Sequence, residues 1–395
     1  MKQNQYVISI CVALFGFSIL ISLIPGDYKY IKYLCPAMFF VLTLPFNTNA
    51  KNIVISKQFG NLLWVSLFII LFTSLLGLIL DSSFEQRFFL ELYFTLSPLL
   101  CVYILNRYYT IQDYDLGVTL VFIFYILYFI GDTLSFGLYN LLSQLSVNTL
   151  KSFIVDSESQ GESNSAFVFG LLAVFFLQKK SYKFFIISLI FVVLSSKRIV
   201  YVGVIGSILF QLSTVDVLTR KYRAIYLLTF MIVGVLVPII LLSLANGTFD
   251  IWIEKNTVVD TNQLTQGRSF VYNILIEKFG YPSLLGTGYG STSSLLSNSD
   301  TSIKLLHSDL LKLAYEFGII GFPIWLLYLS IVFTKNKFST SLYIYIFILF
   351  MTDNVYIYFD VLFVYYFLQI YSFTKTKSTD KYSNHKFIYS NSGAE

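Results

Sequence analysis

Two adjacent cations, Lys197 and Arg198, stand between two apolar runs with almost no loop to separate them. A cation in apolar surroundings needs a negative partner, because an unpaired charge away from water is costly. That partner is either an internal carboxylate, for which Glu91 and Asp132 are candidates, or a bound anion. The pair therefore marks a candidate anion-binding site.

Further reactive side chains occur downstream, in a stretch rich in Gly, Ser, Thr and Asn. Arg268 begins a segment whose apolar residues recur at helical spacing, which predicts a short amphipathic helix over 268–279. The next stretch, Pro-Ser-Leu-Leu-Gly-Thr-Gly-Tyr-Gly at 282–290, cannot continue this helix. Its alternate glycines predict a tight loop whose backbone amides can approach a ligand closely.

His307 is the only histidine before the C-terminal tail, and it lies in a second predicted helix, 302–317, together with Asp309 and Glu316. An imidazole exchanges its proton near neutral pH, which suits a general base. Asp309, Glu316 and Glu91 are rival bases. A permanently charged, planar guanidinium such as that of Arg198 or Arg268 suits a phosphate oxygen.

Other chemistries lack the residues that they need. Cys11, Cys35 and Cys101 all lie inside apolar runs and the chain has two histidines, which argues against a disulfide framework and a zinc site. The glycines of 286–290 are not a dinucleotide fingerprint, because no βαβ unit surrounds them. We expect neither a metal ion nor a cofactor.

The composition places the chain in a bilayer. Of its 395 residues, 56% are hydrophobic, 18% aromatic and only 12% charged, and the mean hydropathy is +0.70. Soluble domains contain about 25% charged residues, so this chain has too little polar surface to cover a soluble globule. A net charge of +5, interrupted by apolar runs, gives no reason to expect a nucleic-acid partner.

The hydropathy pattern predicts an all-α, polytopic integral membrane protein with about twelve transmembrane helices. The first span is expected to stay in the membrane, because no small-residue cleavage site follows it. The predicted spans are 6–24, 31–46, 61–80, 88–105, 116–136, 164–178, 184–197, 199–213, 224–245, 318–334, 341–352 and 355–373.

Lysine and arginine clusters set the expected orientation, because cytoplasmic loops retain these residues. The clusters at 179–180, 220–223 and 335–337 place both termini in the cytoplasm. The chain then divides into nine spans over 1–245, a large helical outer loop over 246–317, three spans over 318–374 and a polar cytoplasmic tail over 375–395.

The order of these features resembles the superfamily of O-antigen polymerases and O-antigen ligases (Wzy and WaaL types). The resemblance rests on a basic turn between two spans and on glycine-, histidine- and glutamate-containing motifs in the long outer loop and at the entry to the next span. The matching stretches are Ser195 to Tyr201, Gly267 to Tyr272, Pro282 to Gly290, His307 to Leu310 and Glu316 to Gly321.

The resemblance implies roles by position. The family's two arginines fall on Arg198 and Arg268 and its loop histidine on His307, so these three are the expected catalytic residues. Asn164 is similar to the family's Pro-Asn element but lacks the proline, and Ser308 stands where the family often has Asn. The expected substrate-binding residues are Lys197, Asn164, Tyr272, Gly288, Tyr289, Asp309 and Glu316.

The resemblance also implies an activity at the outer, periplasmic face of the inner membrane. Family members transfer an oligosaccharide from undecaprenyl diphosphate during the biosynthesis of lipopolysaccharide and other surface polysaccharides. Two arginines facing the diphosphate leaving group would take the place of a divalent metal. We expect a polymerase that joins the lipid-linked glycan to an incoming lipid-linked repeat unit, with membrane lipids and a chain-length regulator as possible partners.

Three alternatives stay open from the sequence. A cell-wall polymerase of the rod-shape type would use a similar lipid donor but has a different loop signature. Another is the O-antigen ligase of the same superfamily, which passes the glycan to a lipid A core. The third is a glycolipid flippase or transporter, which would show symmetric halves and a polar path through the membrane.

Overall fold

The protein is a bundle of helices. The computed structural model describes residues 2–24, 27–44, 53–79, 86–107, 111–136, 164–195, 197–213, 220–256, 261, 265, 267–299 and 306–373, and no strand occurs in these ranges. The elements are α1 (Lys2–Ile21), η1 (Asp27–Leu34), α2 (Cys35–Thr43), α3 (Ile53–Ile79), α4 (Gln86–Asn106), α5 (Ile111–Phe136), α8 (Ser165–Gln178), α9 (Tyr182–Leu194), α10 (Arg198–Leu212), α11 (Arg220–Ala245), α12 (Asp250–Asn256), α14 (Arg268–Phe279), α15 (Ser291–Asn298), α16 (Asp309–Phe333), α17 (Lys337–Thr352), η3 (Val355–Ile357) and a last helix, Phe359–Phe373.

The predicted membrane-protein class is confirmed. Five of the described helices are long and apolar enough to cross a membrane: those in α3, α4, α5, α11 and α16. Seven shorter apolar helices accompany them, and every predicted span falls on one helix of these two sets. The number of helices that cross, twelve, stays a prediction.

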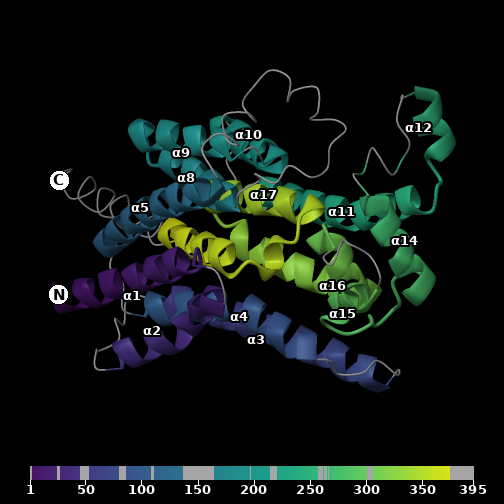
Figure 1. Ribbon diagram of the computed structural model, residues 1–395, viewed down its shortest axis with the longest axis horizontal. Coiled ribbons are helices and arrows are strands. Elements are labelled where there is room, and N and C mark those ends of the chain that lie inside the picture. The colour runs from purple at the N-terminus through teal and green to yellow at the C-terminus, as the bar shows by residue number, and fades with distance from the viewer. Residues whose placement is uncertain are drawn as a thin grey trace, which may run out of the picture.

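The C-terminal helices form the middle of the bundle. Figure 1 shows α16, α17 and the last helix between α1 to α4 on one side and α8 to α11 on the other. Aromatic rings of the last helix pack onto the N-terminal helices, and the Phe15 and Phe363 centroids are 4.1 Å apart. On the other side, Phe230 of α11 lies 4.7 Å from the ring of Tyr343 in α17.

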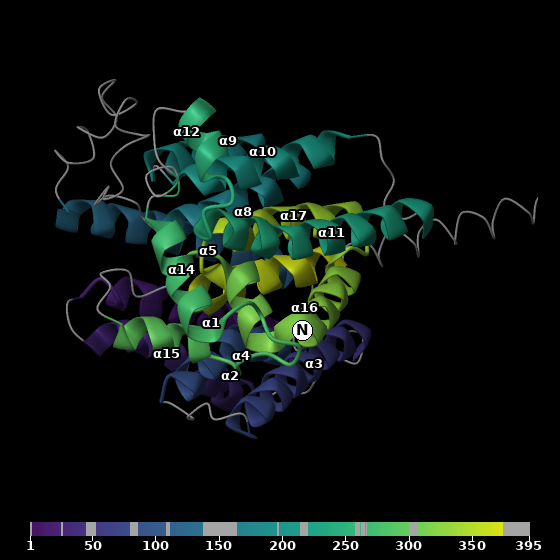
Figure 2. The ribbon, with the colours of Figure 1, turned by 90° about the vertical axis from the view of Figure 1, so that its right-hand side faces the viewer.

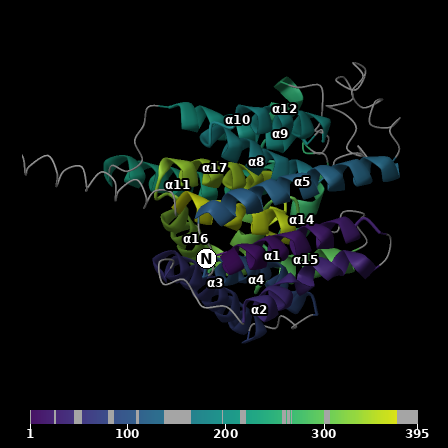
Figure 3. The ribbon, with the colours of Figure 1, turned by 90° about the vertical axis from the view of Figure 1, so that its left-hand side faces the viewer.

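The two ends of the bundle differ in character. Figures 2 and 3 show α12, α14 and α15 gathered at one end. Basic residues lie at the other end, where α8 ends and α11 and α17 begin: Lys179 pairs with Asp115 at 2.7 Å, and Arg223 donates to the Ile331 carbonyl at 3.0 Å. This separation agrees with the expected outer and cytoplasmic sides. Which end faces the cytoplasm stays a prediction.

The glycine-rich loop of 282–290 is a clamp on a kink in α16. At Gly318 the backbone leaves the helical region, with φ of 73° and ψ of 178°. The amides of Thr287 and Gly288 donate to the Tyr315 and Glu316 carbonyls at 2.9 and 3.2 Å. Past the kink, the amide of Ile319 donates back to the loop.

This clamp changes the predicted boundaries. The sequence predicts a helix over 302–317 and a separate span over 318–334, whereas the described chain has one element, α16, that starts at Asp309 and passes through the kink. Residues 302–305 lie outside the described residues. The loop replaces the hydrogen bonds that the kink removes from the helix, so the break predicted at Gly318 does not separate two elements.

Gly318→Ala should strongly destabilise the bundle. A Cβ at this position would overlap the backbone nitrogen of Gly286, and φ is +73°. We expect a loss of about 3 kcal/mol or more in unfolding free energy, from strain plus the overlap. The measurement is thermal unfolding in detergent.

Gly280→Ala is the matched control, because φ is +71° but no atom lies within 4 Å of the added Cβ. It should cost only the backbone strain, about 1 kcal/mol. Equal losses for the two variants would show that the clamp between loop and helix contributes nothing.

Candidate functional site

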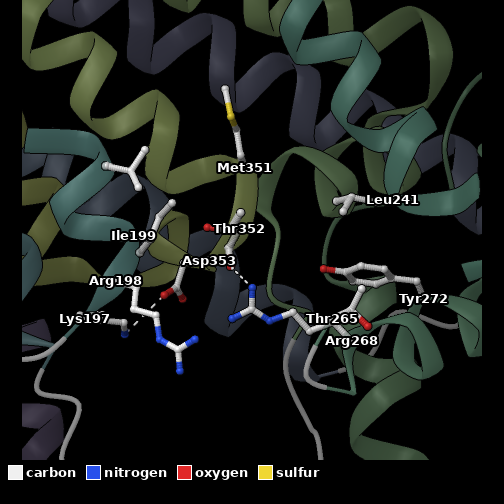
Figure 4. Close-up of a pocket in the computed structure, with 11 residues that line it drawn as sticks. Lys197, Arg198, Ile199, Leu241, Thr265, Arg268, Tyr272, Met351, Thr352 and Asp353 are labelled. Atoms are coloured by element: carbon white, nitrogen blue, oxygen red, sulfur yellow. Dashed lines mark hydrogen bonds and ion pairs between the residues drawn. The ribbon is translucent and has the colours of Figure 1, made fainter. Parts of the chain in front are cut away.

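A cavity of about 360 Å³ lies where α10, α11, α14 and the end of α17 meet (Figure 4). Its polar part holds three cations and one carboxylate, Lys197, Arg198, Arg268 and Asp353. The other lining residues are Ile199, Val202, Leu241, Thr265, Tyr272, Met351 and Thr352. The site therefore combines excess positive charge with an apolar wall.

Arg268 enters the cavity from the first residue of α14. The preceding Gly267 has φ of 78°, a left-handed conformation that turns the chain into the helix. The Arg268 Nη1 donates to the Thr352 carbonyl at 3.0 Å, at the last residue of α17. This bond holds the guanidinium against the end of α17.

Lys197 and Arg198 enter from the start of α10. The Lys197 Nζ lies 3.3 Å from Asp353 Oδ2, 3.1 Å from Asn164 Oδ1 and 4.2 Å from the centroid of the Phe167 ring. Arg198 is exposed at the mouth. Figure 4 shows the guanidinium groups of Arg198 and Arg268 reaching from opposite walls towards the same space.

His307 lies next to the cavity, just before α16. Its Nδ1 is 3.9 Å from Asp353 Oδ1, an ion-pair distance when the imidazole is protonated. The Tyr272 hydroxyl donates to the His307 carbonyl at 3.1 Å, which links α14 to this segment. Burial raises the pKa of Tyr272 to about 12, so its hydroxyl remains a donor at neutral pH.

Asp353 joins these cations. The sequence places it at the outer junction of the last two predicted spans, on the same face as Lys197, but does not single it out as the partner of that lysine. It follows the last residue of α17, and its carboxylate faces Lys197 on one side and His307 on the other. Burial by itself raises the pKa of this carboxyl. The His307 side chain at 3.9 Å, the Lys197 charge at 3.3 Å and the hydrogen bond that the backbone N–H of Asn354 donates outweigh that effect and lower the pKa below 3.8.

The negative partner of Lys197 is thus Asp353, neither Glu91 nor Asp132. Glu91 instead binds Lys312 inside the bundle, with 2.5 Å between Oε2 and Nζ. Both side chains are nearly inaccessible to solvent. Sequence spacing gave no sign of either pair, because each joins segments that are far apart in the chain.

Four of the predicted substrate-binding residues do not line the cavity. The amide of Gly288 donates to a carbonyl of α16, and the Tyr289 ring is stacked on Phe317. The Asp309 carboxylate accepts the backbone N–H of Tyr356 at 2.7 Å. The Glu316 carboxylate accepts the Thr292 hydroxyl at 2.5 Å.

The remaining predicted residues come together. Lys197, Arg198, Arg268 and Tyr272 line the cavity, while Asn164 and His307 contact residues that line it. In the described part of the chain, no group of three or more His, Cys, Asp or Glu side chains has an arrangement that could hold a metal ion. The cationic side chains that line the cavity are Lys197, Arg198 and Arg268.

Comparison with known proteins bears on the same region. Residues 184–326 match the family model described as O-Antigen ligase (Wzy_C). The match supports the O-antigen ligase and polymerase superfamily. No curated protein matches the chain. The matched segment contains both arginines and His307, whereas Asn164 and Asp353 lie outside it.

The family match and the apolar helices together indicate an integral membrane enzyme of O-antigen or polysaccharide assembly. The choice between polymerase and ligase is open at this level.

Acid should weaken the contacts of Asp353. The folded protein holds its carboxyl pKa below the ordinary 3.8, so the stabilisation is complete above pH 3.8 and is lost as pH falls through the lowered value. We expect Asp353→Asn to be less stable than the parent at pH 6, and the difference to shrink at pH 3. Thermal unfolding midpoints at the two pH values measure this.

Lys197→Gln tests the same point from the other partner. It removes one of the charges that lower the pKa of Asp353, which brings the folded-state pKa closer to 3.8. The acid-induced loss of stability should therefore be smaller than in the parent and should end at a higher pH. An acid response that is identical in Lys197→Gln and the parent would contradict the pairing.

Proposed function

We propose that the protein is a surface-polysaccharide polymerase, a glycosyltransferase that takes its donor glycan from undecaprenyl diphosphate. The observation that carries the proposal is the cavity itself. Arg198 and Arg268, from distant segments, reach into one space whose cations outnumber its carboxylates. Such a space suits a diphosphate, and the proposed site faces the periplasm.

The apolar wall supports a lipid donor. Val202 of α10 is 56% exposed and lies on the cavity, next to Ile199, Leu241 and Met351. The inner ends of α10 and α11 are in contact through Phe210 and Tyr226, whose ring centroids are 5.2 Å apart. The polyprenyl chain would lie along this wall with its diphosphate at the arginines.

The transfer reaction assigns a task to each group. The acceptor hydroxyl attacks the anomeric carbon of the donor, and the bond from that carbon to the diphosphate oxygen breaks. Negative charge grows on the departing diphosphate, and Arg198 and Arg268 stabilise it. The proton of the acceptor hydroxyl passes to the His307 imidazole, whose resulting charge Asp353 stabilises from 3.9 Å.

This assignment uses no metal ion, because two guanidinium groups supply the charge that a divalent cation supplies elsewhere. Lys197 has a different task. Its Nζ is occupied by Asp353 and Asn164, so it orients Asp353 while Arg198 faces the substrate. Asn164 and Tyr272 position Lys197 and the His307 backbone, respectively.

Replacing either arginine should lower transfer by at least about a hundredfold, since each removes a donor from the developing charge. Arg198→Ala and Arg268→Ala are assayed with purified protein and lipid-linked repeat units. The control is Arg223→Ala, which removes an arginine at the opposite end of the bundle and should keep activity. Near-normal transfer by a well-folded Arg198→Ala or Arg268→Ala would remove that arginine from the mechanism.

A deletion strain separates the polymerase from the ligase. Loss of a polymerase should leave surface lipid that carries a single repeat unit. Loss of a ligase should leave bare lipid A core and accumulated lipid-linked polymer. Gel analysis of surface lipopolysaccharide shows which pattern occurs, and the second pattern would replace the polymerase assignment with the ligase.

A flippase is the alternative from another class. Elongation of lipid-linked repeats by the purified protein in detergent, where no membrane separates two compartments, would make transport unnecessary for its activity. A protein that moves the lipid across vesicles but never elongates it would support the flippase. A separate chain-length regulator would change only the length distribution of the product.

A further inference from the structure

The short helix α12 carries large apolar side chains on its surface. Ile251 is 84% exposed and Trp252 65% exposed, whereas the neighbouring Ile253 is 2% exposed. The helix is fixed at its start, because the Thr261 hydroxyl donates to the Asp250 carboxylate at 2.5 Å. Ile251 and Trp252 therefore point outwards from this helix. Contact between these two apolar side chains and water would be unfavourable.

The place of α12 in the chain explains this exposure. It follows α11, a candidate membrane span, after a turn closed by bonds such as that from the Thr248 amide to the Ser243 carbonyl at 3.1 Å. Figure 1 shows α12 just past the end of α11, at the same end of the bundle as α14 and apart from α9 and α10. The outward face of α11 is apolar and exposed up to this end: Leu228, Ile232, Val235, Leu236, Ile239 and Ile240.

The surface of α12 therefore continues the lipid-facing surface of α11. Its composition fits the boundary between headgroups and acyl chains, where Trp is enriched and lysines direct their charge towards water. Trp252 and Ile251 supply the apolar face, and Lys255 lies in the last turn. A helix of this kind lies in the interface instead of crossing the membrane.

We propose that α12 docks into the phospholipid leaflet on the cavity side of the membrane, with Ile251 and Trp252 inserted below the headgroups. Only the membrane location of α11 is needed for this, not the transfer reaction. The docking holds the outer end of α11, and α11 supplies Leu241 to the cavity wall. It therefore anchors one side of the proposed lipid-donor site to the bilayer that delivers the donor.

The depth of Trp252 in a bilayer tests the docking. The full chain is reconstituted in phosphatidylethanolamine and phosphatidylglycerol vesicles that contain lipids with a nitroxide near the headgroup or deep in the acyl chain. The emission of Trp252 is the parent spectrum minus that of Trp252→Phe, which leaves the buried Trp325 untouched. We expect stronger quenching by the shallow nitroxide than by the deep one, and weak quenching by aqueous iodide.

Trp64 provides the matched control, because it is 67% exposed near the middle of the membrane span in α3. The parent minus Trp64→Phe spectrum should show stronger quenching by the deep nitroxide. Trp252 emission that is quenched by iodide and by neither nitroxide would overturn the docking and place α12 in water. Emission shielded from all three quenchers would overturn it too, because α12 would then be covered by protein.

Discussion

Asp353 is the charge on which the arrangement of the cavity depends. Its carboxylate faces Lys197 from the start of α10 and His307 from the start of α16, and it belongs to the end of α17. The starts of α10 and α16 and the end of α17 therefore meet at one negative charge. Without it, Lys197 and the two arginines would repel one another across a partly buried space.

Contacts made by the helix α16 connect Asp353 to the rest of the bundle. The backbone N–H of Asp309 donates to the Asp353 carbonyl at 3.0 Å, and the Asp309 carboxylate accepts from Tyr356. Lower in the same helix, Lys312 pairs with Glu91 of α4. A buried ion pair adds little to the free energy of unfolding, but it fixes the relative position of the two helices that it joins. The loop clamp at Gly318 fixes the helix further down, so His307 and Asp353 are placed by several independent contacts.

The elements were predicted well where local signals are strong. The amphipathic helix predicted over 268–279 has the bounds of α14, because apolar spacing and flanking glycines at 267 and 280 define it locally. The membrane helices follow from apolar runs in the same way. The alternate glycines at 286–290 were interpreted as ligand-approaching amides, but long-range contacts with α16 use those amides instead.

Charge pairing could not be predicted, because nothing local distinguishes Asp353 from other acids at helix ends. Its partners Lys197 and His307 precede it by more than one helix, and only the packing of α10, α16 and α17 brings them together. The same holds for Glu91 and Lys312. The arginines and His307 were predicted through the family resemblance, while their common location requires the fold.

The most direct test is calorimetric binding of a short polyprenyl diphosphate to the purified protein, compared with the matching monophosphate and the uncharged alcohol. A cavity in which two guanidinium groups grip the diphosphate predicts that affinity falls from diphosphate to monophosphate to alcohol. It also predicts that this order disappears when Arg198 and Arg268 are both replaced by alanine. Equal affinity for the three lipids, or an unchanged order in the double variant, would contradict the account.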